Sequence, residues 1–323
     1  MKNWRKHSAL YLSLGVVFLL YLWPQITGKA ITKEVTFTIL KAIALATSLN
    51  IFLGYTGYVS FGHIVYFGVG GYVGFFCMSV LGWSLWVAMP VGGLASALIA
   101  FLLGKAILRL RGAYFALATI GVNEAIKVFI RNFDTFGGPI GMTFHVNVYQ
   151  DYGGISNRLP VSFNAMIVVT LLTVLVSYWV KNSKFGLSLV AIREDEDAAE
   201  VMGVVAPNAK TWAYVISAAL PGIVGALFFF KNGNIEPGDA FHLHTSIEMI
   251  VMVMLGGQGT VLGPILGATG YQWLRGTLLT TPVVKDIQLT VAGVLLLVII
   301  LFAPAGAVGW ARNRFPKMRR VLQ

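Results

Sequence analysis

The chain has 323 residues, of which 57% are hydrophobic and only 11% charged, and its mean hydropathy is +0.75. Soluble globular proteins carry about 25% charged residues, so this composition excludes a soluble domain and favours a membrane protein. The net charge of +11 could indicate a nucleic-acid partner, but the placement of the basic residues, described below, predicts membrane topology and no nucleic acid. The single cysteine, Cys77, excludes an intramolecular disulfide and a multi-cysteine metal site.

Apolar runs of about 17–22 residues recur along the chain, which is the length that a helix needs to cross about 30 Å of hydrocarbon. We therefore predict an all-α polytopic membrane protein with a single domain over residues 1–323 and about ten transmembrane helices. The spans lie near residues 9–27, 37–54, 61–80, 84–104, 112–131, 161–180, 211–230, 244–258, 261–280 and 286–303. Ten spans also permit two inverted halves of five helices each. Residues 23–25 offer no small-residue cleavage site, so we expect the first span to be retained.

The basic residues are unevenly distributed between the two sides of these spans. If the N-terminus is cytoplasmic, 15 of the 24 Lys and Arg residues fall in inner segments and six in outer segments or edges. Basic residues are enriched in cytoplasmic loops. The distribution therefore predicts that both termini and the loop 181–210 are cytoplasmic.

The loop 181–210 is a hydrophilic segment between two apolar runs, and it holds five of the 13 acidic residues. Its centre, residues 193–203, predicts a short amphipathic helix, because apolar residues follow i, i+3, i+4, i+7 spacing. They are Ala198, Val201, Met202 and Val205. Such a helix favours docking into a groove of a soluble partner. The alternative is an ordinary solvated loop helix.

Two glycine-rich connections, residues 54–62 and 256–264, join spans without any charged residue. Glycine-interrupted apolar segments are typical of broken helices that line a pathway, although close helix packing also uses glycine. We predict that these glycines lie along a translocation path: Gly54, Gly57, Gly62, Gly256, Gly259 and Gly263.

Ionisable residues inside membrane spans are costly and mark functional candidates. We assign Glu124 and Glu248 to the path; Glu124 can neutralise Lys127 at i, i+3, and Glu248 lies about one turn into its span, within reach of the headgroups. No deep carboxylate pair is evident, which argues against a proton-driven carrier. His242 and His244 stand at i, i+2 rather than on one helix face, so we predict no metal site.

The chain contains no phosphate-binding loop of the type G-x-x-x-x-G-K-[ST]. We therefore predict no catalytic residues and no cofactor, and any ATP hydrolysis belongs to other polypeptides.

Several collinear stretches, residues 54–63, 109–116, 191–203, 246–248, 255–268 and 302–306, closely resemble LivM-type permeases of branched-chain amino acid ABC importers. The resemblance covers roughly residues 37–310. It implies a multi-pass permease of a prokaryotic inner membrane, paired with a second, LivH-like permease and two cytosolic ATP-binding subunits. An external solute-binding protein is expected to deliver leucine, isoleucine or valine.

The resemblance also implies that Asp197, Ala198 and Ala199, followed by Gly203, correspond to the coupling motif of ABC permeases. We expect four apolar residues to pack into a groove on the ATPase, namely Ala198, Val201, Met202 and Val205, with Arg193, Glu194, Asp195 and Asp197 at its border. Small side chains at Ala198, Ala199 and Gly203 are expected to let the partner approach closely. Urea-type ABC permeases are the nearest alternative, and an autonomous secondary carrier is the alternative from another class. Glu194 and the Ala198–Ala199 pair favour the amino acid branch.

Overall fold

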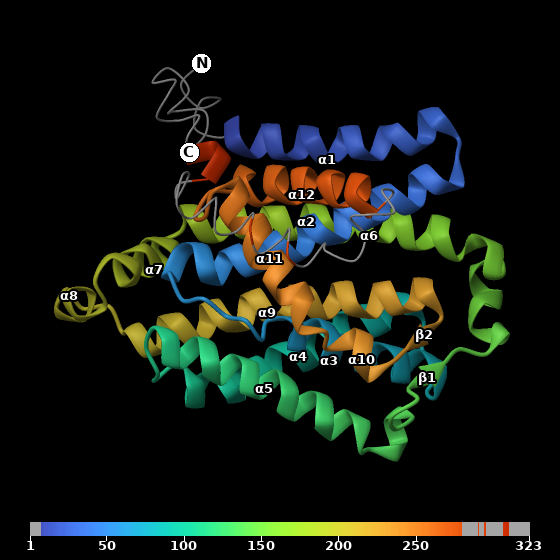
Figure 1. Ribbon diagram of the computed structural model, residues 1–323, viewed down its shortest axis with the longest axis horizontal. Helices are drawn as coiled ribbons and strands as arrows, with labels where there is room; N and C mark the ends of the chain where they lie inside the picture. Colours follow the sequence, from blue (N-terminus) through green and yellow to red (C-terminus); the bar gives the residue numbers. More distant parts are fainter. Residues whose placement is uncertain (1–7, 280–289, 291–293, 295–305, 310–323) are drawn as a thin grey trace.

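The computed structural model describes residues 8–279, 290, 294 and 306–309, and these residues form an almost entirely helical bundle (Figure 1). The helices of the first part are α1 Ser8–Thr27, α2 Ala30–Thr56, α3 Ile64–Ser79, α4 Leu85–Ile107 and α5 Ala113–Arg131. The others are α6 Arg158–Asn182, α7 Lys184–Glu194, α8 Glu196–Val201, α9 Ala206–Asn232, α10 Pro237–Ala240, α11 Leu243–Gly256 and α12 Leu262–Leu279. The prediction of an all-α polytopic membrane protein is confirmed.

Six helices of the described part are long and apolar enough to cross a membrane, namely α1, α2, α4, α5, α6 and α9. The predicted spans 61–80 and 244–258 correspond to shorter helices, because α3 has 16 residues and α11 has 14. At 1.5 Å per residue they cover about 24 and 21 Å, less than the roughly 30 Å of hydrocarbon. The span 261–280 corresponds to α12, and the predicted span 286–303 lies outside the described residues.

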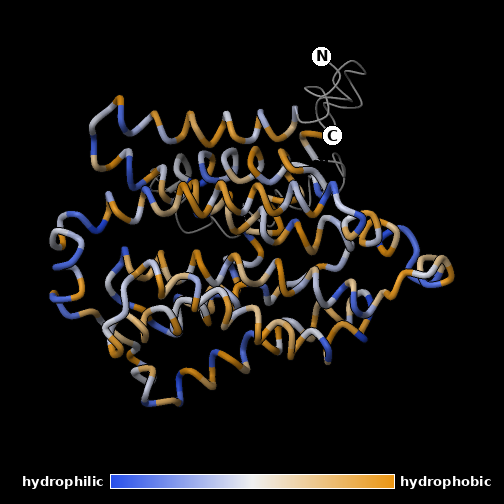
Figure 2. The backbone as a smooth tube through the Cα atoms, turned by 180° about the vertical axis from the view of Figure 1, so that it is seen from behind, coloured by the Kyte–Doolittle hydropathy of each residue, from blue (hydrophilic) through white to orange (hydrophobic). Residues whose placement is uncertain are grey.

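Helices α2 and α9 form the centre of the bundle. Helix α2 packs against α6, α9, α11 and α12, while α9 packs against α3, α4 and α6 as well. The outer helices, in contrast to α2 and α9 at the centre, expose large apolar side chains such as Phe18, Leu19 and Leu98. Hydrophilic residues gather at the two ends of the bundle and apolar residues between them (Figure 2). This distribution matches a bundle whose sides face lipid.

The connection between α5 and α6 closes one end of the bundle. It contains three 3₁₀ helices, η2 Asp134–Phe136, η3 Val146–Tyr152 and η4 Ile155–Asn157, and the strand β1 Met142–Thr143. Strand β1 pairs antiparallel with β2, Asn234–Ile235, just after α9. The hydroxyl of Tyr149 donates to the carbonyl of Phe230 at 2.9 Å, and that of Tyr152 accepts from the backbone N–H of Leu85 at 2.6 Å. This loop is therefore fastened across the ends of α4 and α9.

Helices α7 and α8 project from the opposite end, here called the α8 end (Figure 1). The two glycine-rich connections also reach this end, and both are non-helical, over residues 57–63 and 257–261. Gly57 ends α2 in the left-handed conformation, with φ of 77°, and its N–H donates to the carbonyl of Leu53. From there residues 57–63 run back into the bundle, where the N–H of Ile64 donates to Ser246 Oγ at 3.0 Å. Helix α3 therefore begins inside the bundle rather than at its end.

Candidate functional site

Two side-chain caps fix the geometry of the segment that carries α7 and α8. Ser183 Oγ accepts from the N–H of Gly186 at 3.0 Å and begins α7, and Asp195 Oδ1 accepts from the N–H of Ala198 at 3.0 Å and begins α8. Such caps stabilise a helix start by about 1 kcal/mol. Asp195, which we expected to border a partner as an exposed charge, therefore has a structural role in starting α8.

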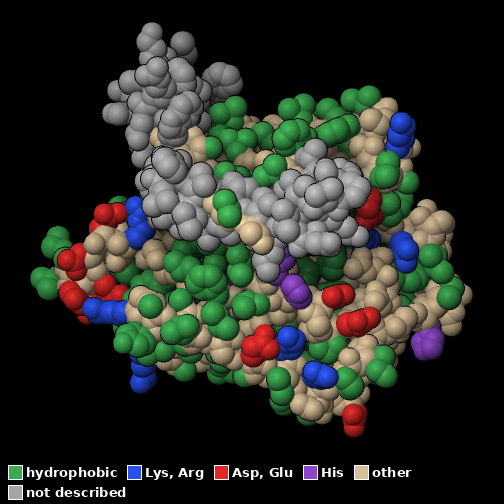
Figure 3. Space-filling model, in the orientation of Figure 1, with side chains coloured by type: hydrophobic (Ala, Val, Ile, Leu, Met, Phe, Trp, Pro, Cys, Tyr) green, Lys and Arg blue, Asp and Glu red, His purple; other side chains and the backbone are tan. Residues whose placement is uncertain are grey.

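The end of α8 presents an apolar tip, defined as Ala198, Val201, Met202 and Val205, all exposed. Figure 3 shows hydrophobic side chains at this tip with acidic and basic side chains around them. Gly203 follows with φ of 89°, and the space where a Cβ would stand is open. Ala199 differs, because it is only 4% exposed. The expectation that Ala199 meets a partner is wrong, since the chain itself fills the space around this side chain.

Glu196, on the inner side of α8, holds a buried cation. Its Oε1 lies 2.6 Å from Lys210 Nζ, and its Oε2 accepts from the hydroxyl of Tyr58 at 2.6 Å. Lys210 is only 2% exposed and also donates to Tyr58 Oη and to the carbonyl of Leu108, each at 3.2 Å. Burial raises the pKa of Glu196, but the hydrogen bonds from Lys210 and Tyr58 outweigh it and the pKa is lowered overall. Four separate segments therefore meet at one charged network.

Arg111 extends this network to the surface. Its guanidinium makes two hydrogen bonds with Asp197, at 2.9 and 3.3 Å, and lies 3.6 Å from Glu196. The hydrogen bond from Arg111 lowers the pKa of Asp197. Two-pronged Arg–carboxylate pairs fix orientation as well as distance. The connection between α4 and α5 is thereby fastened to α8.

The end of α7 contacts the end of α2 and the turn between α11 and α12. Arg193 Nη1 donates to the carbonyl of Gly54 at 3.0 Å. The side-chain amide of Asn50 accepts from the N–H of Gly259 at 2.9 Å and donates to the carbonyl of Thr260 at 3.0 Å. A Cβ on Gly259 would stand 3.0 Å from the Gly54 carbonyl oxygen and 3.1 Å from Arg193 Nη1, so the approach leaves little room for a side chain. We call this meeting of residues 50, 54, 193, 259 and 260 the α8-end junction.

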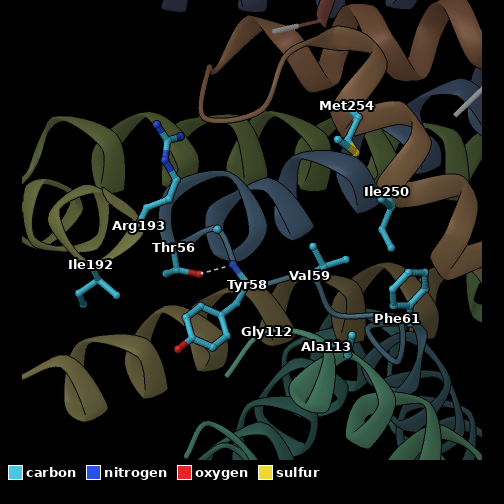
Figure 4. A pocket seen from close by; sticks show the side chains of 12 residues that line it. Thr56, Tyr58, Val59, Phe61, Gly112, Ala113, Ile192, Arg193, Ile250 and Met254 are labelled. Carbon is cyan, nitrogen blue, oxygen red and sulfur yellow. Dashed lines mark hydrogen bonds between the residues drawn. The ribbon is translucent and has the colours of Figure 1, made fainter. Parts of the chain in front are cut away.

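A cavity of about 560 Å³ lies beside the junction. Its lining is mostly apolar and comes from the connection after α2, the start of α5, the end of α7 and the inner face of α11 (Figure 4). Tyr58, Phe61, Ile250 and Met254 are among its lining side chains, and Gly57 and Arg193 line it as well. The cavity therefore joins the predicted coupling segment to one of the two glycine-rich connections.

The predicted glycines divide into two groups. Gly54, Gly57 and Gly259 lie at the junction or the cavity, as described. Gly62, Gly256 and Gly263 instead allow close packing: a Cβ on Gly62 would collide with the backbone of Thr119, and Gly256 and Gly263 face one another. The structure thus places the second group in backbone contacts rather than in the lining of the cavity.

The two predicted carboxylates lie apart from the junction. Glu124 is exposed on α5 and pairs with Lys127 at 3.4 Å, as the i, i+3 spacing predicts. Glu248 is buried on α11, where it pairs with Arg275 at 3.0 Å and with His244 at 3.2 Å. The expectation that Glu248 reaches lipid headgroups is wrong, because its partners hold it inside the bundle.

Asn50, Tyr58, Arg111, Glu196 and Lys210 complete the site, although the sequence reasoning did not select them. The available signals were a carboxamide within an apolar run at Asn50 and a lysine at the very start of an apolar run at Lys210. Neither signal indicates which residue the side chain contacts.

The fold and the polar network at its end define a multi-pass membrane protein with a polar, cavity-bearing end. The chain belongs to the family described as the permease component of branched-chain amino acid transport systems, whose model matches residues 32–301.

Among similar proteins, the permease protein LivM of the high-affinity branched-chain amino acid transport system of Salmonella typhimurium is 30% identical over 269 residues, which cover 76% of this chain and 63% of that protein. LivM of Escherichia coli K12 is 29% identical, covering 79% and 65%, and BraD of Pseudomonas aeruginosa is 26% identical, covering 82% and 90%. The chain thus spans slightly less than two thirds of the two LivM proteins. No solved structure matches it.

Proposed function

We propose that this chain is the membrane-spanning permease subunit of an ATP-driven importer of leucine, isoleucine and valine. An external binding protein delivers the substrate, a second permease resembling LivH completes the membrane part, and two cytosolic subunits hydrolyse ATP. The names of the LivM and LivH relatives, as permeases of branched-chain amino acid systems, support this assignment.

One observation carries the coupling part of the proposal: the exposed apolar tip of α8 is tied to the cavity by hydrogen bonds and ion pairs. Arg193 contacts Gly54 beside the cavity, and Glu196 contacts Tyr58 in its lining. A partner that moves the tip therefore acts on the cavity through named bonds. In this proposal Arg193, Glu194, Asp197, Ala198, Val201, Met202 and Gly203 form or border the ATPase contact.

The finer topology belongs to the same proposal. Ten spans, the last at 286–303, place both termini and the loop 181–210 in the cytosol, in agreement with the excess of basic residues on that side. The α8 end is then cytosolic, and the loop between α5 and α6 faces the binding protein. The whole chain, residues 1–323, is one permease domain, and two inverted halves of five helices remain compatible with this count.

The test is reconstitution in proteoliposomes with the candidate partner subunits and binding protein. Uptake of radiolabelled leucine should require ATP on the side of the membrane where the ATPase subunits are bound. It should stop when a hydrolysis-deficient ATPase replaces the active one. Leucine uptake by this chain alone, driven by a proton gradient, would identify a secondary carrier instead. Uptake of urea without leucine uptake would identify the urea-type alternative.

A further inference from the structure

A cluster of charged side chains lies inside the bundle, away from the α8-end junction. Its centre is Glu248 of α11, whose side chain is 5% exposed. Arg275 of α12 lies 3.0 Å from its Oε1, and the hydroxyl of Tyr271 donates to the same oxygen at 3.4 Å. His244 Nε2 also lies 3.2 Å from Oε1. The single negative charge is thus fully matched by its neighbours on α11 and α12.

A second cation faces this pair from α2. Helix α2 packs against both α11 and α12, and the charges that act on Lys41 are first Glu248 and Arg275 and then Lys231 and Glu34. Lys41 Nζ lies 4.2 Å from the ring centre of Phe228, and within the described residues no carboxylate lies at ion-pair distance from it. Lys231 and Glu34 pair with each other, so Lys41, Arg275 and Glu248 are left with two positive charges and one negative charge. Unmatched charge is costly in a membrane interior, so this excess favours an anionic ligand.

The unused hydrogen-bonding atoms of the cluster also favour an anionic ligand. Arg275 Nε and His244 Nδ1 are buried, and neither has a hydrogen-bond partner among the residues that the structure describes. A guanidinium offers its donors in a planar fork that matches the two oxygens of a carboxylate. The Arg275 side chain is 32% exposed, so an oxygen ligand can reach it without unfolding the helices.

The depth of the cluster suits a substrate on its way through the protein. Lys41 precedes Gly54 by 13 residues along α2, and Glu248 precedes Gly256 by eight along α11. At 1.5 Å per residue, Lys41 lies about 20 Å along α2 from Gly54 of the junction, and Glu248 lies about 12 Å from the end of α11.

We infer that Lys41 and Arg275 bind the α-carboxylate of a zwitterionic amino acid, with Glu248 holding the Arg275 guanidinium in place. This site rests on the proposed function, since a transported amino acid supplies the carboxylate. It assigns to α2 and α12 a binding role that is separate from the cavity beside the junction.

Direct binding to the complex in lipid nanodiscs, without the external binding protein, tests the assignment. Labelled leucine is displaced by three probes: leucine, 4-methylpentanoate, which keeps the carboxylate but lacks the ammonium, and leucinamide, which lacks the carboxylate. We expect leucine and 4-methylpentanoate to compete and leucinamide to fail. Lys41→Met and Arg275→Gln should each weaken leucine binding roughly tenfold or more, the loss of a hydrogen bond to a charged group.

The matched control is Lys105→Met, because Lys105 also stands over an aromatic ring, with Nζ 4.3 Å from the centre of Phe101, but lies at the α8 end of α4. It should leave binding unchanged. Lys41→Arg keeps the charge and should restore most of the affinity, which separates loss of the site from misfolding. Co-purification of the partner subunits verifies assembly of every variant.

Two results would contradict the inference, and only one of them would also contradict the proposed function. If wild-type complex takes up and binds leucine, and both Lys41→Met and Arg275→Gln keep its affinity and its preference for a carboxylate, the site is wrong while the proposed function stands. If the wild-type complex takes up none of leucine, isoleucine and valine, the proposed function fails and this site fails with it.

Discussion

Arg193 Nη1 donates a hydrogen bond of 3.0 Å to the carbonyl oxygen of Gly54, a residue 139 positions earlier in the chain. The last carbonyls of a helix have no partner within that helix, and a cation at this end also complements the helix dipole. Arg193 of the coupling segment therefore supplies the hydrogen-bond donor and the positive charge that the C-terminal end of α2 lacks. This contact places the predicted coupling loop directly on a predicted glycine-rich connection.

Arg193→Met should weaken the contact between α7 and α2 by about 1.5–3 kcal/mol, because a charge-assisted hydrogen bond is lost while an apolar stem remains. In reconstituted complexes we expect leucine uptake to fall several-fold, with ATP hydrolysis continuing and no longer stimulated by the binding protein. Lys184→Met is the control, since Lys184 is exposed on the same helix. Equal uptake in both variants would show that the Arg193–Gly54 contact does not transmit coupling.

Glu196→Gln should destabilise the chain by about 3 kcal/mol, because Lys210 is 2% exposed and would keep its charge without a carboxylate. Adding Lys210→Met removes the unmatched charge and should recover most of the loss. Thermal unfolding of the single and double variants measures both effects. Additive losses in the double variant would contradict a direct energetic link between the two side chains.

The same network predicts a pH dependence. The pKa of Glu196 is held below its ordinary value of 4.5, so the folded state favours the ionised carboxylate. This stabilisation is present above about pH 4.5 and is lost as the pH falls through the folded-state pKa. Unfolding midpoints of wild type and Glu196→Gln, compared from pH 7 down to pH 3.5, should converge. A constant difference over this range would contradict the prediction.

Met202→Asp should weaken ATPase binding without unfolding the permease, since the side chain is 85% exposed at the apolar tip. Burying an unpaired charge in a partner's groove costs several kcal/mol. Ile140→Asp is a matched control, because Ile140 is 84% exposed at the opposite end of the bundle. A pull-down of the ATPase with each variant decides the matter: equal recovery would mean that the tip faces solvent only.

Periodicity and run length were enough to predict the helices, because a membrane helix satisfies its own backbone and needs only a continuous apolar stretch. Helices α1, α2, α4, α5, α6 and α9 lie where the sequence placed spans. The lengths of α3 and α11 were overestimated, since apolar residues continue into the non-helical connections around Phe61 and Gly257. The membership in the permease family was also evident from the sequence and is confirmed.

The partners of individual side chains could not be predicted in the same way. Asn50 binds the turn at Gly259 across 209 positions, and Lys210 reaches Tyr58 across 152. Such pairs depend on how the helices are arranged, which no local pattern encodes. Ala199 illustrates the limit within one turn of helix: the sequence shows a small residue but not the side that it faces.

The network around Glu196 also implies an order of biosynthesis. Tyr58, Leu108, Glu196 and Lys210 come from four successive parts of the chain, and the cation that joins them is made last. Until the start of α9 has been synthesised, Glu196 cannot pair with Lys210. Helix α8 therefore lacks the contacts that hold it against the connections at residues 58 and 108. The network that seats α8 can thus form only once Lys210 has been made, while α11, α12 and the junction contacts of residues 259 and 260 are still to be synthesised.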